Sequence, residues 1–357
     1  MIALPCHVLL ERCGSTRSPD GHARAGVRLF SKCRNELLRL PAFLAYYRGL
    51  GVRSFFIVDN DSTDGTSEYL AEQPDVRVYA TNGAFREARG GTDWLNALLR
   101  HHGTGHWCLT VDIDELFRYP GSESTGLDQL AAFLDTKGSQ ALACLLLDMY
   151  PAEPLAKVQY SSGADLIAAA PYFDRGPYRR TPYHQCPGYA IYGGVRERVF
   201  YPSSWEDKLP RRLHVKLYHR VLLSIPLVRN FPPLLQRRPR FPPCLTKIPL
   251  VRWERETRYL NVNHFVSDRR IAAETGVLLH FKLLQDFHER AAEEVRRKQY
   301  YDGATEFVRY AAMLKEQPDL VFVGEHSERF QDNQQLQRLG MMTDTPAWVH
   351  AREQGPI

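Results

Sequence analysis

An acidic cluster follows a short apolar run at residues 107–110. Asp112, Asp114 and Glu115 come directly after this run. Residues two apart in an extended chain point the same way, so the carboxylates of Asp112 and Asp114 can converge on one point. Two carboxylates at one point repel each other, and a divalent cation, which prefers oxygen ligands, relieves that repulsion. The spacing predicts a metal site, with a solvated polar strand end as the alternative.

Two more apolar runs upstream end in polar residues. Residues 27–31 lead into a basic and acidic turn at 32–36, and residues 54–58 lead into a turn rich in Asp, Asn, Ser, Thr and Gly at 59–66. An apolar-periodic segment at 37–50 separates them. Strand, polar turn and helix in repetition predict an α/β protein with a parallel sheet, and such sheets hold ligands at the carboxyl ends of their strands.

Taken together, these motifs resemble the donor half of glycosyltransferase family 2. The motifs are K-x-R-N-E at 32–36, D-N-D-S-T-D-G-T at 59–66 and V-D-I-D-E at 111–115. The resemblance covers residues 27–148 well and 193–310 more loosely. It implies the GT-A fold, a Rossmann-like mixed sheet flanked by helices, and transfer of a sugar from a nucleotide-diphosphate sugar to an acceptor hydroxyl, with inversion. It also implies Mn²⁺ or Mg²⁺ as the cofactor.

The resemblance assigns donor contacts to two loops and one further arginine. The implied nucleotide-contacting residues are Lys32, Arg34, Asn35, Glu36, Asp59, Asn60 and Asp61. Asn60 stands where the family commonly has Asp, and this leaves the nucleobase open because a neutral amide presents a donor as well as an acceptor. Arg89 is expected at the diphosphate or ribose. The alternative for each residue is a structural cap.

The implied metal site joins three residues from distant parts of the chain. Asp112 and Asp114 match the family's D-x-D motif, and His280, in the apolar run 276–284, matches a late histidine that completes such sites. Lys282 lies on the same side of that run and is expected at a phosphate. The alternative for His280 is a hydrogen-bonded core histidine.

The sugar pocket and the catalytic base are implied by the looser part of the resemblance. Gly193 and Gly194 begin a segment, 193–200, that resembles the glycine-containing strand lining the family's sugar pocket. An inverting transferase needs a carboxylate to take the acceptor's proton. Asp207, in the pair Glu206-Asp207, is our first choice, and Asp148, which ends the apolar run 141–147, is the second.

A basic, proline-rich segment interrupts the second half. The chain has 357 residues and a net charge of +5, yet residues 208–252 hold eleven Lys or Arg, eight Pro and no Asp or Glu. Such proline density forbids long helices, so we predict an irregular insertion. Its charge suits a membrane surface or an anionic, lipid-linked acceptor, and a solvated basic loop is the alternative.

These observations give a domain plan. We expect an N-terminal extension (1–26), a GT-A domain (27–290, with donor half 27–120 and acceptor half 140–290) and a C-terminal helical segment (291–357). No apolar run is long enough for a transmembrane helix, and the first residues make a poor signal peptide. Seven scattered cysteines suggest a reducing compartment, so we expect a cytoplasmic protein, with contact to the inner face of the membrane if the insertion binds lipid. No nucleic-acid partner is expected.

Two other functions compete with the transferase reading. V-D-I-D-E also resembles the D-x-D loop of haloacid-dehalogenase-like phosphatases, although that loop normally stands near the chain start. The second competitor is a nucleotide-sugar-binding module without turnover. Metal-dependent cleavage of a sugar nucleotide would separate the module from a transferase.

Overall fold

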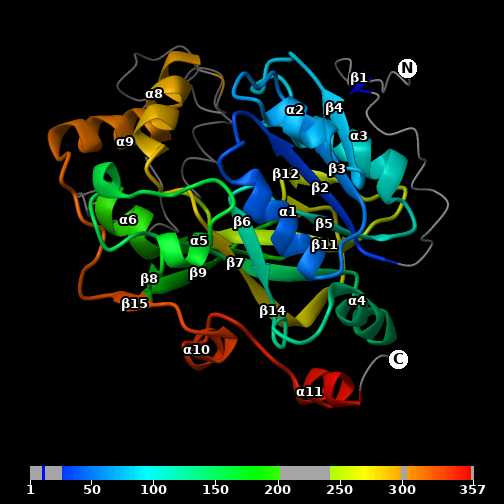
Figure 1. Ribbon diagram of the computed structural model, residues 1–357. Coiled ribbons are helices and arrows are strands. Elements are labelled where there is room, and N and C mark those ends of the chain that lie inside the picture. Colours follow the sequence, from blue (N-terminus) through cyan, green and yellow to red (C-terminus); the bar gives the residue numbers. More distant parts are fainter. Residues whose placement is uncertain (1–9, 13–25, 202–241, 298, 300–303, 355–357) are drawn as a thin grey trace, which may run out of the picture.

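The computed structural model describes residues 10–12, 26–201, 242–297, 299 and 304–354. Their centre is a nine-stranded mixed sheet (Figure 1). In spatial order its strands are β1 (Leu10–Arg12), β4 (Val76–Ala80), β3 (Phe55–Asp59), β2 (Arg28–Cys33), β5 (Trp107–Thr110), β11 (Thr246–Arg252), β7 (Ala141–Asp148), β14 (Ile271–His280) and β6 (Glu115–Arg118). The mixed α/β sheet flanked by helices is therefore confirmed.

The central strands are apolar throughout because both faces of the sheet are covered. In β3, Phe55 and Ile57 join one core cluster, whereas Phe56 and Val58 join another on the opposite face. Helices α1 (Leu40–Gly49) and α4 (Leu127–Thr136) pack in the first cluster, and α3 (Thr92–Leu98) packs in the second. A strand buried on both faces reads as a continuous apolar run.

A third core cluster lies beside the sheet. It joins α6 (Gly194–Phe200), α8 (Phe287–Arg297) and α9 (Thr305–Glu316), and Phe200, Phe287 and Tyr310 are buried in it. Figure 1 shows these helices together on one flank, away from α1 to α3. The cluster anchors the segment that follows β14.

Shorter elements complete the description. The small two-stranded pairs are β9 (Tyr178–Pro182) with β10 (Tyr189–Gly193), β12 (Tyr259–Asn261) with β13 (Phe265–Val266), and β8 (Tyr172–Asp174) with β15 (Ser327–Arg329). The remaining helices are α2 (Thr66–Ala71), α5 (Leu166–Ala169), α10 (Asn333–Arg338) and α11 (Pro346–Glu353), with a π turn at Leu99–Gly103 and a 3-10 turn at Leu155–Lys157. In the described part of the chain, no helix has the length and apolar character needed to cross a bilayer.

The prediction of an irregular insertion at 208–252 is wrong for its last residues. Residues 246–252 form β11, which lies inside the main sheet between β5 and β7. Pro249 cannot donate to a strand ladder, and the register with β7 shifts between Lys247 and Leu250 where it lies. Residues 208–241 lie outside the described residues.

Two other expectations need correction. The segment 193–200 is not a strand, because β10 ends at Gly193 and Gly194–Phe200 is helix α6. Both glycines have positive φ, 139° and 71°, which turns the chain sharply between the two elements. The domain boundary predicted at 290 falls inside α8 (Phe287–Arg297), so the chain is helical on both sides of it. The rest of the domain plan remains a prediction.

Candidate functional site

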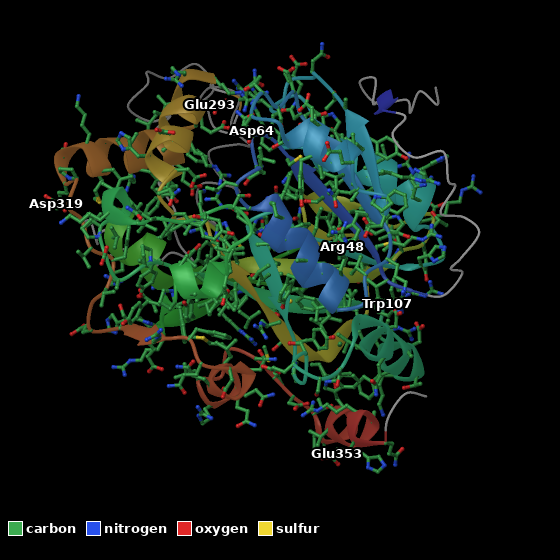
Figure 2. The ribbon with its side chains drawn as sticks, in the orientation of Figure 1. Arg48, Asp64, Trp107, Glu293, Asp319 and Glu353 are labelled. Carbon is green, nitrogen blue, oxygen red and sulfur yellow. The ribbon has the colours of Figure 1, made fainter. Side chains whose placement is uncertain are left out.

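The candidate site lies at the carboxyl ends of the central strands of the main sheet. Strands β2, β3 and β5 are parallel, β11 is antiparallel to both β5 and β7, and β14 is parallel to β7. The carboxyl ends of β2, β3, β5, β7 and β14 therefore share an edge. Figure 2 labels Asp64, just beyond the end of β3, and Trp107, the first residue of β5, toward opposite ends of these strands.

His280, the last residue of β14, joins two of the predicted acids. Its Nε2 lies 3.4 Å from Asp114 Oδ2, and its Nδ1 lies 2.6 Å from Asp148 Oδ1. The other oxygen of Asp148 accepts a hydrogen bond from Arg196 Nε at 2.8 Å. All four side chains are buried. Both oxygens of Asp148 thus have partners inside the protein.

Asp112 is held by two lysines. Lys32 Nζ lies 2.5 Å from its Oδ1, and Lys247 Nζ lies 3.2 Å from its Oδ2. Lys247 has two further acceptors, Glu115 Oε1 at 2.9 Å and Asn263 Oδ1 at 2.7 Å. Asp112 is the most accessible member of this group, with 27% of its side chain exposed.

These charges shift the pKa values of their neighbours. Burial alone would raise the pKa of Asp148, but Arg196 and His280 lower it to about 2. Burial likewise opposes a charge on His280, yet Asp114 and Asp148 outweigh it and raise the pKa of the imidazole. For Glu115 burial wins over Lys247, and its pKa is raised.

The fit of these residues to a divalent cation can be judged from the Asp114–His280 pair. Two adjacent ligands of an octahedral ion such as Mg²⁺, each about 2.1 Å from it, lie about 3.0 Å apart, so Asp114 Oδ2 and His280 Nε2, which are 3.4 Å apart, would have to move slightly closer to share one. A ligating histidine typically has its other nitrogen bonded to a carboxylate, as His280 has with Asp148. The donor types of the pair, an oxygen and a ring nitrogen held by a carboxylate, are those that a divalent cation binds.

Asp112 does not complete that pair in the present arrangement. Within the described residues, no group of three or more His, Cys, Asp or Glu is arranged to hold a metal ion. Mg²⁺ is commonly bound through one or two carboxylates and substrate phosphates rather than by a protein cage. An ion here would therefore need ligands from the substrate, or from Asp112 after its release by the lysines.

The two nucleotide-contacting loops of the prediction are bonded to each other. Arg34 Nη1 donates to the carbonyl oxygens of Asn60 at 2.7 Å and Asp61 at 2.5 Å. The backbone N–H of Asn35 donates to Ser62 Oγ at 2.9 Å. These bonds hold the two loops side by side. They give Arg34 and Asn35 a structural role, which was the alternative to contact with the nucleotide.

Asp59 and Asn60 also have internal partners. Asp59 Oδ1 accepts from the Ser62 hydroxyl at 2.5 Å. Asn60 is buried, and its amide donates to the carbonyls of Thr81 at 3.2 Å and Gly83 at 3.1 Å. Its two donors are therefore used within the protein rather than offered to a base edge. Asp61 is different, since 66% of its side chain is exposed.

Glu36 joins the first loop to α8. Its Oε1 lies 2.5 Å from Arg290 Nη2, and its Oε2 lies 3.5 Å from Arg39 Nη1. Burial raises the pKa of Glu36 to about 7, although Arg290 and Arg39 oppose the shift. The carboxylate is only 6% exposed and so has little surface for a nucleotide.

Two other predicted contacts, Arg89 and Lys282, pair with acids outside the V-D-I-D-E motif. Arg89 pairs with Asp93 at 2.5 Å and is half exposed. Lys282 Nζ lies 3.6 Å from Glu306 Oε1 and 4.5 Å from the centre of the Phe307 ring. Among the described residues, neither has a hydrogen bond or ion pair with Asp112 or Asp114, although the charge of Asp114 favours the charged form of Lys282.

Gly193 and Gly194 line a separate cavity of about 370 Å³. Its polar lining comes from Asp174, Arg179, Glu197, Arg198, Tyr201 and His326. Helix α6 separates it from Asp148, because Arg196 of this helix bonds Asp148 while Arg198 bonds Asp174 at 2.9 Å. Glu206 and Asp207, the predicted base pair, lie outside the described residues.

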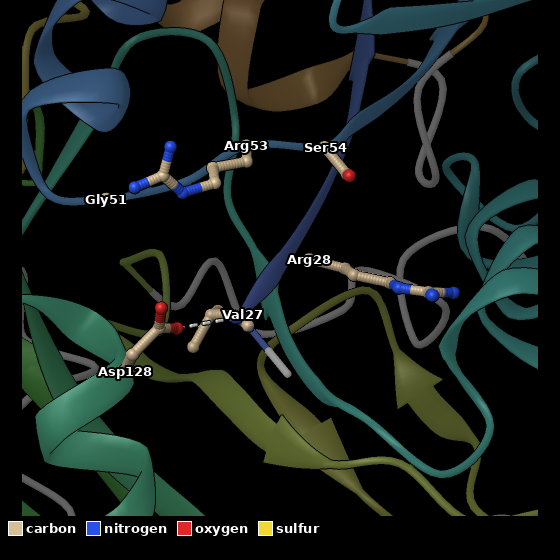
Figure 3. A pocket seen from close by; sticks show the side chains of 7 residues that line it. Val27, Arg28, Gly51, Arg53, Ser54 and Asp128 are labelled. Carbon is tan, nitrogen blue, oxygen red and sulfur yellow. Dashed lines mark hydrogen bonds between the residues drawn. The ribbon is translucent and has the colours of Figure 1, made fainter. Parts of the chain in front are cut away.

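A second cavity lies far from these residues. It has a volume of about 20 Å³, enough for about one water, and Figure 3 shows it between Val27, Arg53 and Asp128. It surrounds the amino end of β2, where the Val27 N–H donates to Asp128 Oδ1 at 2.9 Å. It is too small for a nucleotide.

Sequence reasoning missed Lys247 and Arg196. Lys247 was counted as one charge of the basic insertion, although it is only 2% exposed. Arg196 was read as part of a strand. The sequence does contain a signal for Lys247, which is the only lysine or arginine in the largely apolar stretch 245–251. A charged residue in such a stretch is seldom buried without a partner of opposite charge.

The chain is similar in part to a protein of known sequence and to solved structures. The chain is 28% identical over 92 residues to a glycosyltransferase family 92 protein of Oryza sativa subsp. japonica. That match covers 26% of this chain and 16% of the relative, so the chain spans only a small part of that protein. No protein-family model matches the chain.

One of the solved structures that resemble the chain is a crystal structure of 4-diphosphocytidyl-2C-methyl-D-erythritol synthase. It is 18% identical, and the match covers 41% of this chain and 70% of that chain with a TM-score of 0.24. At this TM-score the match carries no weight beside the strand order of the main sheet. The sequence match indicates a distant likeness to a glycosyltransferase.

Proposed function

We propose that this chain is a glycosyltransferase of the GT-A type that moves a sugar from a nucleotide-diphosphate sugar to an acceptor hydroxyl, with inversion. The observation that carries the proposal is the contact chain Asp114–His280–Asp148 beside Asp112 at the carboxyl edge of the sheet. The match to a glycosyltransferase family 92 protein supports the transferase class. The family 2 resemblance of the motifs supports the inverting course.

The reaction breaks the bond between the anomeric carbon of the sugar and an oxygen of the diphosphate. Positive charge develops on the sugar and negative charge on the leaving diphosphate. The acceptor oxygen forms the new bond on the opposite face, and its proton passes to a carboxylate. The ammonium groups of Lys32 and Lys247 beside Asp112 would attract the diphosphate.

We also propose that Asp114 and His280 hold Mn²⁺ or Mg²⁺, with Asp112 as a third ligand. Such an ion neutralises charge on the leaving diphosphate as a Lewis acid. The nearness of Asp114 to His280, with the other ring nitrogen of His280 bonded to a carboxylate, supports this assignment. Asp148 keeps the ring in place through Nδ1, and Arg196 keeps Asp148 in place.

The catalytic base and the acceptor remain predictions from sequence. Asp207 stays our first choice, with Glu206 beside it. Asp148 is less suited to this role, because it is 3% exposed and both its oxygens are bonded. Binding of an anionic or lipid-linked acceptor, or of a membrane, by residues 208–241 also remains a prediction.

A thermal-shift panel tests the donor and the ion together. UDP-, GDP- and dTDP-sugars are each added with and without Mn²⁺. A ligand that binds only the native state stabilises it by about 2.7 kcal/mol at about a hundred times its Kd. We expect one nucleotide class to raise the melting temperature, and to do so more in Mn²⁺.

Asp112→Asn and Asp114→Asn should each remove the Mn²⁺-dependent part of that shift and abolish transfer while the protein stays folded. The control is Asp75→Asn, which removes a carboxylate near the amino end of β4 that pairs with Arg48 on the surface. An undiminished Mn²⁺ effect in Asp114→Asn would contradict the metal assignment. Release of inorganic phosphate without transfer would favour the phosphatase, and binding without release of nucleoside diphosphate would favour the binding module.

A further inference from the structure

We propose that Lys32 is an exchangeable counter-ion of Asp112: it holds this carboxylate while the site is empty and yields it when a divalent cation and a diphosphate enter together. The inference rests on the proposed function, since it takes Asp112 as a ligand of that ion. It adds that Lys32 competes with the ion for Asp112 and then pairs with the diphosphate.

The side chain of Lys32 is held in one position. Its Nζ lies 2.5 Å from Asp112 Oδ1 and 5.8 Å from the centre of the Phe85 ring. A Cβ on Gly91 would lie 2.5 Å from Lys32 Cδ, closer than real Cβ atoms come, so the glycine leaves the space in which the lysine stem runs. The positive φ of Gly91, 80°, also favours glycine there. The chain is thus built to deliver this ammonium group to Asp112.

The two lysines on Asp112 are not equivalent. Lys247 has a 3% exposed side chain and is bonded to Glu115 and Asn263 as well, so it keeps partners when Asp112 moves. Lys32, by contrast, pairs with one carboxylate among the described residues, that of Asp112, and its side chain is 13% exposed. Lys32 is therefore the lysine that loses fewer protein partners when Asp112 is released, and its ammonium group can then pair with a ligand.

An ion cannot take Asp112 without displacing an ammonium group. Both oxygens of this carboxylate face lysines, and a divalent cation placed among them meets two like charges. Binding of Mn²⁺ alone must therefore release Lys32 with no new partner. A diphosphate that shares the ion provides that partner, since Lys is a common phosphate ligand. Ion and diphosphate consequently strengthen each other's binding, and the effect is reciprocal.

The test measures binding in the full chain, with Mn²⁺ and UDP, GDP or dTDP as probes. Free Mn²⁺ is followed by electron paramagnetic resonance in the wild type and in Lys32→Met, whose side chain fills the same channel without the charge. In Lys32→Met we expect Mn²⁺ alone to bind about tenfold more tightly. The diphosphate that the wild type prefers should bind about tenfold more weakly at saturating Mn²⁺.

Two further variants interpret the result. Lys137→Met removes a lysine at the end of α4, which is a control for the loss of one positive charge. Lys32→Gln replaces Lys32→Met if the latter does not fold. Unchanged or weaker Mn²⁺ binding in the Lys32 variants, with normal binding in the wild type, would overturn the inference and leave the metal site standing. No Mn²⁺ binding in any variant, with or without diphosphate, would overturn the metal site itself and the inference with it.

Discussion

Asp148 illustrates how the surroundings of a residue decide its role. At the sequence level it is an acid that ends an apolar run, which suits a catalytic base. In the structure one oxygen holds His280 and the other is bonded to Arg196. A base must reach the acceptor's proton within hydrogen-bond distance. A buried carboxylate with two internal partners is better suited to orient His280.

Asp148→Asn tests this positioning role. We expect Mn²⁺ affinity to fall about tenfold or more, because partners of a ligating histidine typically contribute that much. The measurement is Mn²⁺ titration at low temperature, since Arg196 loses the nearer of its two carboxylate partners, Asp148 and Glu306, and the variant is also expected to unfold earlier. Unchanged Mn²⁺ affinity with a lost acid limb in the pH profile of transfer would instead identify Asp148 as the base.

At the scale of elements, β14 is the strand on which the site depends. It lies between β7, to which it is parallel, and β6, to which it is antiparallel. Its last residue, His280, is in register with Asp148 on one side and Glu115 on the other. The strand thus brings the late histidine to both acidic segments.

Gly276→Ala probes the packing of this strand. A Cβ at Gly276 would lie 2.7 Å from the backbone oxygen of Arg118 and 3.0 Å from Cys144 Sγ, so one of the neighbouring strands must move. We expect a loss of about 1–3 kcal/mol in the free energy of unfolding, measured in urea. The control is Gly49→Ala at the end of α1, where a Cβ has no neighbour within 4 Å. Equal stability of the two variants would contradict the tight fit.

Elements with a single clear pattern were predictable, and those with mixed patterns were not. Strands β2, β3 and β5 are apolar runs followed by polar turns, so both their type and their order could be read. Strand β11 was missed because Pro249 and two basic residues obscure a segment that a bulge accommodates. Helix α6 was missed because Gly193-Gly194 suggested a strand, while Val195, Arg196 and Phe200 are the buried residues of a helix.

The site was predictable only as far as its motifs reach. The carboxylate pair and His280 follow from local patterns and from resemblance. The lysines that neutralise Asp112 could not be paired with it, since a charge pairing across the sheet depends on register rather than on local sequence. The internal bonds of Asn60 could not be read for the same reason.

At the scale of the whole molecule, buried charges tie distant segments together. Arg39, at the start of α1, has no exposed surface and lies 2.6 Å from Asp286 Oδ2, after β14. Its Nε also donates to the carbonyl of Phe281 at 3.2 Å. A buried charge that loses its partner typically costs several kcal/mol. The stability of the protein should therefore respond to pH.

His264 is one residue through which the free energy of unfolding should depend on pH. Burial, with Lys247 nearby, lowers its pKa to about 3, and its Nδ1 lies 2.7 Å from the carbonyl of Thr246. The unfolded chain takes up a proton below pH 6.5, whereas the folded protein does so only near pH 3. Stability from this group is therefore present above pH 6.5 and falls as the pH drops toward 3.

His264→Gln should remove that part of the acid sensitivity. Between pH 6.5 and 5 we expect the wild type to lose about 1 kcal/mol more than the variant, less than the full ~2 kcal/mol because the ring is not fully buried. Urea unfolding at the two pH values measures the difference. His288→Gln, at an exposed position of α8, is the control. Parallel losses in the wild type and His264→Gln would exclude this origin of the pH dependence.

The pairing of β6 with β14 also imposes an order in time. In the main sheet β6 pairs with β14, and Arg118 is in register with Val277. A ribosome adding about 5–20 residues per second needs about 8–30 seconds to travel from one to the other. During that interval the nascent chain carries Asp112 and Asp114 without the strand that brings His280 to them. Ion binding by these carboxylates and His280 is thus a property that a growing chain acquires late, after its first parallel strands have been made.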